Sequence, residues 1–353
     1  HQWLQLQLRN ENFSQQSIDL EHSVGWAVTE QERNGFKLDT EYADKLMMDL
    51  MFEMNNIEAE LQSIFPPIVE ERISEKTGKR LKDKVTVFNP GSRKQIAERL
   101  QGLGVTFKKK TEKGNIIVDE KVLDSISLPE AKAVARYMML QKRVAQIDSW
   151  LKAVKDDGRV HGRVITNGAV TGRMTHLSPN MAQVPAVSAP FGTECRSCWT
   201  VDEGNVLVGI DASGLELRML AHYMDDEDYT NEILNGDIHT ANQRAAGLKT
   251  RTLAKTFIYA FLYGAGDAKI GAIVGGNSFT GRRLKETFLS NTPSLERVRG
   301  DTHIEAKSGV LTGLDGRKLR VRSEHAALNT LLQGAGAIVM KQALIHLSDR
   351  LKN

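Results

Sequence analysis

Hydrophobic residues recur at steps of three and four along two long segments of the chain. The first segment lies between Asp39 and Pro66-Pro67, and its apolar residues are Tyr42, Leu46, Met47, Leu50, Met51, Met54, Ile57, Leu61 and Ile64. The second follows Leu128-Pro129, and its apolar residues are Tyr137, Leu140, Val144, Ile147 and Leu151. This spacing places each set on one face of a helix. We therefore predict a helix from its Asp39 cap to the prolines and a helix over 130–155, packed side by side.

A different pattern lies in the middle of the chain, where apolar residues follow one another directly. Residues 206–210 (VLVGI) are typical of a short buried strand. The strand ends at Asp211, and turn residues 212–214 lead into an amphipathic helix that begins at Leu215. A carboxylate at such a strand end can hold a metal ion against a substrate phosphate. The alternative is an ordinary strand–turn–helix unit with a capping aspartate.

Segment 250–266 (TRTLAKTFIYAFLYGAG) predicts a helix with one charged face. Its first residue is a suitable N-cap, and the glycines after Tyr263 end the helix. Arg251, Lys255 and Tyr259 recur every four residues and therefore lie along one face. Two cations followed by a phenol form a track for a polyphosphate with a flat surface at its end. The alternative is a solvated basic stripe, which does not account for the two tyrosines at helical spacing.

Shorter signals predict other elements. Residues 18–32 are typical of a helix, and residues 68–86 are charged and indicate a linker of low order. Residues 310–321 predict a hairpin, because Asp315-Gly316 is a strong two-residue turn signal.

A candidate phosphate-binding helix begins after residue 91. Ser92 and Gln95 form a capping box, and Arg93 and Lys94 lie in the first turn. A helix N-terminus with cations in this position suits a phosphate group. Between residues 72 and 113 there are thirteen Lys and Arg against four Asp and Glu. This local excess favours a surface that contacts nucleic acid, or simply a solvated basic face.

Composition narrows the class of protein. The chain has 353 residues, 41% of them hydrophobic, with a net charge of +3. No run approaches the roughly 18 apolar residues of a membrane-spanning helix, so we expect no membrane association. Cys195 and Cys198 are the only cysteines, which excludes a disulfide framework. They form half of a zinc-site pattern, and we expect a buried pair without metal. The sequence contains no P-loop.

Several of these segments resemble, in the same order, the motifs of family A (Pol I-like) DNA polymerases. DASGLELR at 211–218 resembles the first palm motif, and RTLAKTFIYAFLYG at 251–264 resembles the nucleotide-binding fingers helix. GAVTGRMTHLSPNMAQVP, EILNGDIHT, GLDGRK and HAALNTLLQGAGA are similar to the replicative polymerases of podovirus-type phages. The resemblance begins near residue 17. It implies an α+β, mostly helical fold in the right-hand architecture of thumb, palm and fingers, with an incomplete palm sheet.

The resemblance also divides the chain. It implies a remnant of an upstream domain or linker at 1–16, a thumb at 17–156, a first palm part at 157–224, fingers at 225–328, and a truncated second palm part at 329–353. In the family a 3′–5′ exonuclease precedes this region. Because at most its last residues remain here, we expect no proofreading.

Functional residues are implied where this sequence matches the family motifs. Those implied for catalysis or metal binding are Asp211, the Ala212 carbonyl, Arg251, Lys255 and His239, of which the last three contact the triphosphate. Those implied for the nucleotide are Glu216, which excludes a ribose 2′-OH, Tyr259 by the sugar and base, Tyr263 at the template position, and Gly264. Those implied for primer–template DNA are Arg173, Gln183, Asn329 and Gln333 along the nascent duplex, and Ser92, Arg93 and Lys94 in the thumb.

Polymerases of this family hold two Mg²⁺ ions with two palm carboxylates. Asp211 matches the first carboxylate, whereas the His-Asp-Glu motif that carries the second is not in this sequence. Either a second polypeptide supplies that motif or the chain is truncated, so we expect barely any extension by the chain alone. Residues 68–86 are a short version of the insertion that binds thioredoxin in some phage enzymes, and we expect no thioredoxin partner.

The resemblance implies template-directed DNA synthesis from dNTPs on a primer–template, in the cytoplasm of an infected bacterial host. One alternative is a catalytically incomplete fragment that still binds primer–template, or one half of a split polymerase. The other alternative is a single-subunit RNA polymerase, whose fingers helix is similar. Glu216 argues against an RNA polymerase, because in the DNA polymerases a Glu at this position blocks the 2′-OH.

Overall fold

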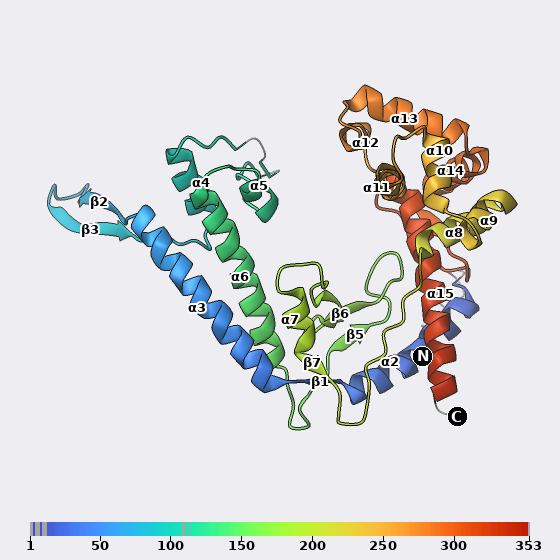
Figure 1. Cartoon of the computed structure of the whole chain (residues 1–353), viewed down its shortest axis with the longest axis horizontal. Coiled ribbons are helices and arrows are strands. Elements are labelled where there is room, and N and C mark those ends of the chain that lie inside the picture. Colours follow the sequence, from blue (N-terminus) through green and yellow to red (C-terminus); the bar gives the residue numbers. More distant parts are fainter. Residues whose placement is uncertain (1–2, 4–7, 9–12, 108–109, 112, 352–353) are drawn as a thin grey trace. The chain divides into compact units, whose positions relative to one another are not determined.

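The computed structural model describes residues 3, 8, 13–107, 110–111 and 113–351 (Figure 1). The remnant or linker expected over 1–16 falls mostly outside the described residues. The fold is mostly helical with small antiparallel sheets, which confirms the predicted α+β class. The chain forms two compact units, each assembled from separated segments. Unit 1 comprises 1–34, 162–182 and 208–353, and unit 2 comprises 35–161 and 183–207.

Unit 2 is built on two long helices, α3 (Thr40–Ile64) and α6 (Pro129–Leu151), which lie along each other (Figure 1). Both helices were predicted, although α6 ends four residues earlier than expected. The Asp39 carboxylate caps α3 by accepting the Tyr42 N–H at 2.9 Å. Arg136 of α6 forms a two-pronged ion pair with Glu53 of α3, at 2.7 and 3.0 Å.

The remaining elements of unit 2 are small. They include α4 (Arg93–Gly102), α5 (Glu120–Asp124), α7 (Gly192–Ser197), and a sheet of β4 (Arg159–Val160), β1 (Phe36–Leu38) and β7 (Trp199–Thr200) in that order. Cys195 and Cys198 precede β7 and are buried, as expected, and they form no disulfide with each other. Burial raises the pKa of Cys198 to about 12, so this thiol stays protonated at neutral pH.

The predicted linker at 68–86 is wrong, because this segment is an antiparallel hairpin. It consists of β2 (Ile68–Ile73) and β3 (Arg80–Thr86), which pair Val69 with Val85. Lys84 and Glu70 face each other across the strands at 3.0 Å. The charged residues of this segment suggested a linker of low order. In the structure Lys84 and Glu70 pair across the two strands, where opposite charges support strand pairing.

Unit 1 contains the other helices and two hairpins. Its helices are α2 (Gln15–Asn34), α8 (Leu215–Met224), α9 (Glu227–Leu234), α10 (Ile238–Ala246), α11 (Arg251–Leu262), α12 (Asp267–Ile273), α13 (Ser278–Ser290), α14 (Pro293–Ala306) and α15 (Ala327–Leu351). Its hairpins are β5 (Arg163–Ile165) with β6 (Thr175–Leu177), and β8 (Val310–Thr312) with β9 (Lys318–Arg320). Short 3₁₀ turns lie at η1 (Met181–Gln183), where the chain passes between the units, and at η2 (Glu324–Ala326).

One hydrophobic core joins α8, α11, α13 and α15 in unit 1. At its centre the Phe288 ring meets the rings of Phe257 and Phe261 edge-on, at centroid distances of 5.1 and 5.5 Å. Leu217 of α8 and Leu332 of α15 are buried in the same core. Helix α2 packs on α15 and so belongs with unit 1, whereas the expected thumb included residues 17–34.

The buried strand predicted at 206–210 is wrong. Residues 205–212 form no strand, and Val206 and Ile210 are 81% and 77% exposed. A strand must pair its backbone with a neighbouring strand, and the part of the chain that is described places none beside this segment. The predicted helix after it is confirmed as α8. Among the described residues, no helix is long and apolar enough to cross a membrane.

Candidate nucleotide-binding site

Helix α11 presents its polar track on one side and its core residues on the other. Thr250 caps the helix, since its hydroxyl oxygen accepts the Leu253 N–H at 3.2 Å. Arg251 and Lys255 are exposed, and Tyr259 is half-buried. The opposite face is buried in the core of unit 1. The helix, its cap and its single polar face therefore agree with the sequence pattern.

The Arg251 guanidinium is held by an acidic residue that the sequence analysis missed. Its Nε and Nη2 donate to the Asp237 carboxylate at 2.6 and 3.1 Å. Asp237 also caps α10, accepting the His239 N–H and the Thr240 hydroxyl. The hydrogen bond from Arg251, followed by that from Thr240, lowers the pKa of Asp237 well below its usual range. An Asp two residues before the candidate His, where a helix begins, was the signal that could have revealed it.

His239 lies beside this ion pair with its ring against the tyrosine of α11. The ring centroids of His239 and Tyr259 are 6.2 Å apart. Burial, followed by the nearby charges of Arg251 and Lys255, lowers the pKa of His239. The imidazole is therefore neutral at pH 7. Its Nδ1 is buried and has no hydrogen-bond partner in the described part of the chain. The structure thus brings both cations, the histidine and the tyrosine together.

A second contact joins the end of α11 to the start of α8. The Tyr263 hydroxyl donates to a Glu216 carboxylate oxygen at 3.5 Å. Burial, then the nearby Glu216 and Tyr263, raise the pKa of Tyr259. Gly264, which follows, has φ +71°, and an added Cβ would overlap the carbonyl oxygen of His325. A close backbone approach in unit 1 therefore requires glycine at this position.

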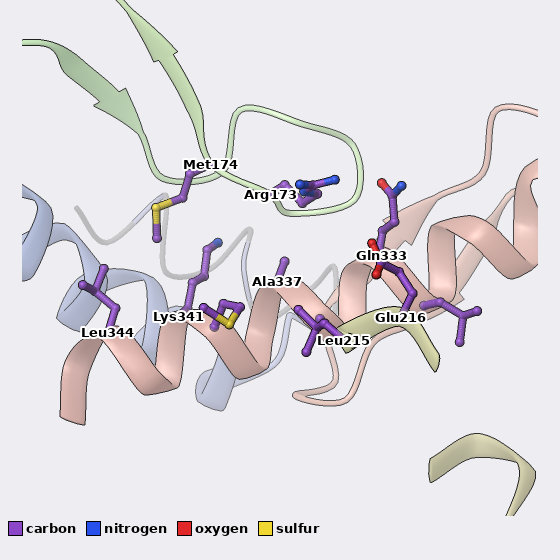
Figure 2. Close-up of a pocket in the computed structure, with 11 residues that line it drawn as sticks. Arg173, Met174, Leu215, Glu216, Gln333, Ala337, Lys341 and Leu344 are labelled. Atoms are coloured by element: carbon purple, nitrogen blue, oxygen red, sulfur yellow. The ribbon is translucent and has the colours of Figure 1, made fainter. Parts of the chain in front are cut away.

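Glu216 also lines a cavity of about 380 Å³ in unit 1. Figure 2 shows Arg173 on the loop between β5 and β6, with Gln333 and Lys341 on α15 and Glu216 at the start of α8. The structure therefore gathers three of the predicted residues, Arg173, Glu216 and Gln333, around one cavity. Asn329 lies on α15, one turn before Gln333.

Asp211 and Ala212 stand in the exposed segment before α8. The Asp211 side chain is exposed and makes no hydrogen bond or ion pair with the residues described. A carboxylate and a carbonyl oxygen are ligands that Mg²⁺ prefers, so the residue types fit the expected ion. They provide one carboxylate of the pair that a two-metal site uses. Within the described residues, no group of three or more His, Cys, Asp or Glu could hold a metal ion.

The other predicted DNA-binding residues belong to unit 2. The Ser92 hydroxyl caps α4, accepting the Gln95 N–H at 3.4 Å, and Arg93 and Lys94 are exposed. The other half of the predicted capping box is wrong. The Gln95 side chain accepts the Asn89 N–H at 2.7 Å rather than the N–H of Ser92. The Asn-Pro-Gly turn before the helix brings the Asn89 amide within reach.

Gln183 also lies in unit 2, at the end of η1. Its side chain is exposed, and its backbone carbonyl accepts a hydrogen bond from the Gln146 amide of α6 at 2.7 Å. The structure therefore separates the predicted residues into a unit 1 group, which includes the nucleotide residues, and a unit 2 group of Gln183, Ser92, Arg93 and Lys94.

The chain is similar in sequence to known DNA polymerases. A family model described as DNA polymerase family A matches residues 59–353. The DNA-directed DNA polymerase of Escherichia phage T7 is 39% identical over 424 aligned residues, covering 96% of this chain and 60% of that protein, and the enzyme of Enterobacteria phage T3 gives the same figures. The thermostable DNA polymerase I of Thermus aquaticus is 27% identical, covering 95% of this chain and 41% of that protein.

A solved structure shares the fold. It is described as the POL domain of Pol1 from M. smegmatis in complex with DNA primer-template and dNTP, with a TM-score of 0.79 and 21% identity, covering 94% of this chain and 60% of that one. The chain spans 60% of the length of the T7 and T3 proteins. The family match covers most of the chain, and the motifs at 211–218 and 251–264 lie within it. This chain belongs to DNA polymerase family A.

Proposed function

We propose that this chain provides the nucleotide- and duplex-binding parts of a template-directed DNA polymerase, which adds dNTPs to a primer 3′-OH. The observation that carries the proposal is the polar face of α11, where Arg251 and Lys255 stand beside a neutral His239. A triphosphate carries several negative charges and many acceptor oxygens, and this face offers two cations and an imidazole donor to match them.

Each residue of this face has its own part in binding the nucleotide. Arg251 meets the triphosphate through the Nη1 edge, because Asp237 holds its other edge. Lys255 supplies a point charge, and the imidazole of His239 donates a hydrogen bond. Tyr259 offers a flat ring to the sugar and base, and Tyr263 stands at the template position. Gly264 shapes the turn that ends α11.

We assign Asp211 and the Ala212 carbonyl to Mg²⁺. Bound there in the complete site, two such ions would stabilise the attacking and leaving oxygens of phosphoryl transfer. Asp211 is exposed and therefore accessible to a cation. The second carboxylate belongs to a His-Asp-Glu motif that a further polypeptide segment supplies. The imidazole of His239 and the paired Arg251 bind and orient the nucleotide independently of that segment.

The duplex follows residues of both units. Arg173 and Gln333 face the minor groove at the primer end, where every base pair offers acceptor atoms, so that they test the shape of a pair without reading its sequence. Asn329 extends this contact on α15 of unit 1. In unit 2 we assign Gln183 to the duplex as well. The capped N-terminus of α4, with exposed Arg93 and Lys94, contacts backbone phosphates of the duplex.

We assign α3 and α6 to the thumb and α9–α14 to the fingers, with α8, α15 and the segment before α8 in the palm. The partners are primer–template DNA and dNTPs, in the cytoplasm of an infected bacterium. Thioredoxin is not among them, because the segment at its expected place is the short hairpin β2–β3.

A binding and extension assay tests this proposal. The chain should bind a fluorescent primer–template, and a matched dNTP should bind that complex. Extension should be barely detectable with the chain alone, and it should appear when a palm fragment carrying the His-Asp-Glu motif and Mg²⁺ are added. No binding of primer–template would contradict the function as a whole. Binding without extension in the mixture would favour the alternative, a catalytically incomplete primer–template-binding fragment.

Glu216 gives a prediction about sugar choice. Its carboxylate contacts Tyr263 and lines the cavity with Gln333, so a ribonucleotide 2′-OH at this place would meet a clash and disturb the hydrogen bond. That penalty is roughly 1–3 kcal/mol, so Glu216→Ala should raise rNTP incorporation about tenfold relative to dNTP. Single-nucleotide extension in the complemented enzyme measures this ratio.

Glu227→Ala is the matched control for this prediction. Glu227 lies in the first turn of α9, as Glu216 lies in the first turn of α8, and its side chain is exposed. A Glu that only favours the helix dipole would therefore be equivalent in both helices. Equal rNTP use by the two variants would remove the sugar gate and reopen the RNA polymerase alternative.

A further inference from the structure

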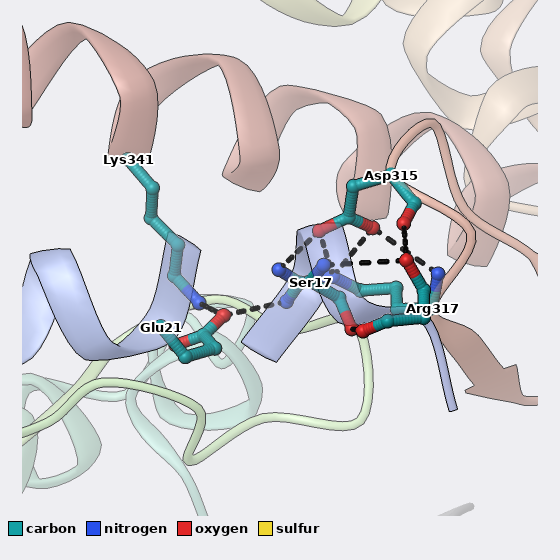
Figure 3. Close-up of polar contacts among 6 residues, drawn as sticks. Ser17, Glu21, Asp315, Arg317 and Lys341 are labelled. Carbon is teal, nitrogen blue, oxygen red and sulfur yellow. Dashed lines mark hydrogen bonds and ion pairs between the residues drawn. The ribbon is translucent and has the colours of Figure 1, made fainter. Parts of the chain in front are cut away.

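Four charged side chains form a largely buried cluster inside unit 1 (Figure 3). Asp315 and Arg317 come from the β8–β9 hairpin, Glu21 from α2 and Lys341 from α15. Arg317 donates to Asp315 through Nε at 2.9 Å and Nη2 at 2.7 Å, and to Glu21 through Nη1 at 2.7 Å. Lys341 donates to the same Glu21 oxygen. Asp315, Arg317 and Lys341 are only 2%, 7% and 1% exposed.

The charges of this cluster cancel, so it adds no net charge to unit 1. Removing four charges from water is costly even when they are paired, and well-packed hydrophobic residues usually stabilise a fold equally well. Burial accordingly lowers the pKa of Lys341, against the opposing effect of Glu21. The distinctive property of such a cluster is geometry, because each hydrogen bond fixes a direction as well as a distance.

The cluster touches the loop that carries Arg173. Gly172 has φ +74°, and a Cβ added there would lie 2.9 Å from Nη1 of Arg317, so the guanidinium lies directly against this backbone. The backbone oxygen of Thr171 lies close to Gly334, the residue after Gln333 on α15. The loop contributes two backbone hydrogen bonds of its own, from Gly172 to Ala169 and from Ala169 to Arg173. The position of this loop relative to α15 therefore depends on the Arg317 guanidinium, which packs against the Gly172 backbone.

We propose that Arg317 is a positioning residue, which sets the loop at 167–173 so that Arg173 faces the cavity with Gln333. Asp315 orients the guanidinium from the hairpin side. Glu21 and Lys341 tie the same group to α15, two turns beyond Gln333, so that loop and helix share one anchor. The positioning of the loop is independent of the proposed function. The contact of Arg173 with primer–template DNA rests on the proposed function.

Hydrogen exchange of the loop tests the positioning without any DNA. In Arg317→Met, the rate of amide hydrogen exchange over 167–173 should rise tenfold or more. Such a rise reports local opening of the loop while the rest of the fold is unchanged. Gly172→Ala should produce the same rise, because the added Cβ would press on Nη1 of Arg317 and push the guanidinium away from the loop, so it answers the question if the first variant does not fold. Arg320→Met is the control, because Arg320 is an exposed cation of the same hairpin. Unchanged loop exchange in Gly172→Ala, or in a folded Arg317→Met, would overturn the proposal.

A double-mutant cycle on primer–template affinity tests the consequence. Arg173→Ala and Gly172→Ala should each weaken binding by roughly tenfold, and the double variant should be no weaker than Arg173→Ala alone, because coupled residues do not add. Additive losses would overturn positioning through Arg173. If Arg173→Ala left affinity unchanged while the loop exchanged faster in Gly172→Ala, the positioning would stand and the proposed DNA role of Arg173 would fail.

Discussion

Replacing Gly264 with alanine is expected to destabilise unit 1 by about 3 kcal/mol. A residue with a Cβ at φ +71° pays roughly 1–2 kcal/mol in backbone strain. The new Cβ would also overlap the His325 carbonyl oxygen, and forcing an atom into a packed place costs roughly 1–3 kcal/mol more. The neighbour is backbone, which cannot turn away as a flexible side chain can.

Urea unfolding, followed by tryptophan fluorescence and circular dichroism, measures this loss of stability. Gly266→Ala is the matched control, because Gly266 lies two residues further, has φ −65°, and would have no atom within 4 Å of an added Cβ. Alanine there should be neutral or stabilise by about 0.4–1 kcal/mol, through the unfolded state. If both variants unfolded at the wild-type denaturant concentration, the tight approach at Gly264 would be refuted.

The long helices could be predicted because each buries a stripe of its own local sequence. The pattern between Asp39 and the prolines contains its cap, its apolar face and its stop, so α3 needs no distant information. The β8–β9 hairpin is equally local, although its turn is longer than the predicted two-residue loop. The Gly316 N–H donates to the Gly313 carbonyl, and the Gly313 N–H donates to the Arg317 carbonyl. Residues 206–210 show the limit of this reasoning. Their apolar run has strand character, but a strand forms only where another strand pairs with it.

The candidate site likewise contains features that the sequence predicts and features that it does not. The spacing of Arg251, Lys255 and Tyr259 is a property of one helix and was visible in the sequence. That spacing did not reveal the partner of Arg251, because Asp237 lies fourteen residues earlier, where another helix begins. The buried charge cluster could not be predicted from local sequence, because Glu21 and Lys341 are separated by 320 residues. Arg317 lies in the predicted hairpin, but nothing in that local pattern showed that it is buried and paired with Asp315 and Glu21.

Removing Lys255 or Arg251 should weaken nucleotide binding strongly, but for different reasons. Lys255 makes no hydrogen bond or ion pair with the residues described, so its whole charge is available to a triphosphate. Lys255→Ala should therefore weaken dNTP binding to the primer–template complex by roughly 10- to 100-fold, the size of one charge-assisted hydrogen bond. Arg244→Ala is the control, because Arg244 is an exposed cation of the adjoining α10. A fall in DNA affinity with unchanged dNTP affinity would place Lys255 on the duplex instead.

Arg251→Ala should weaken dNTP binding more than Lys255→Ala does. Besides losing a donor, it leaves the Asp237 carboxylate without the cation that now lies 2.6 Å from it. Arg251 is the main cause of the low pKa of Asp237, but an ordinary Asp carboxylate is also ionised at pH 7, so in the variant it would repel the incoming triphosphate. Asp237→Asn removes the repulsion while its side-chain oxygen can still cap α10. The double variant Arg251→Ala/Asp237→Asn should therefore bind dNTP several-fold more tightly than Arg251→Ala, although more weakly than wild type. If the second substitution brought no recovery, the Asp237 charge would have no effect on the bound triphosphate.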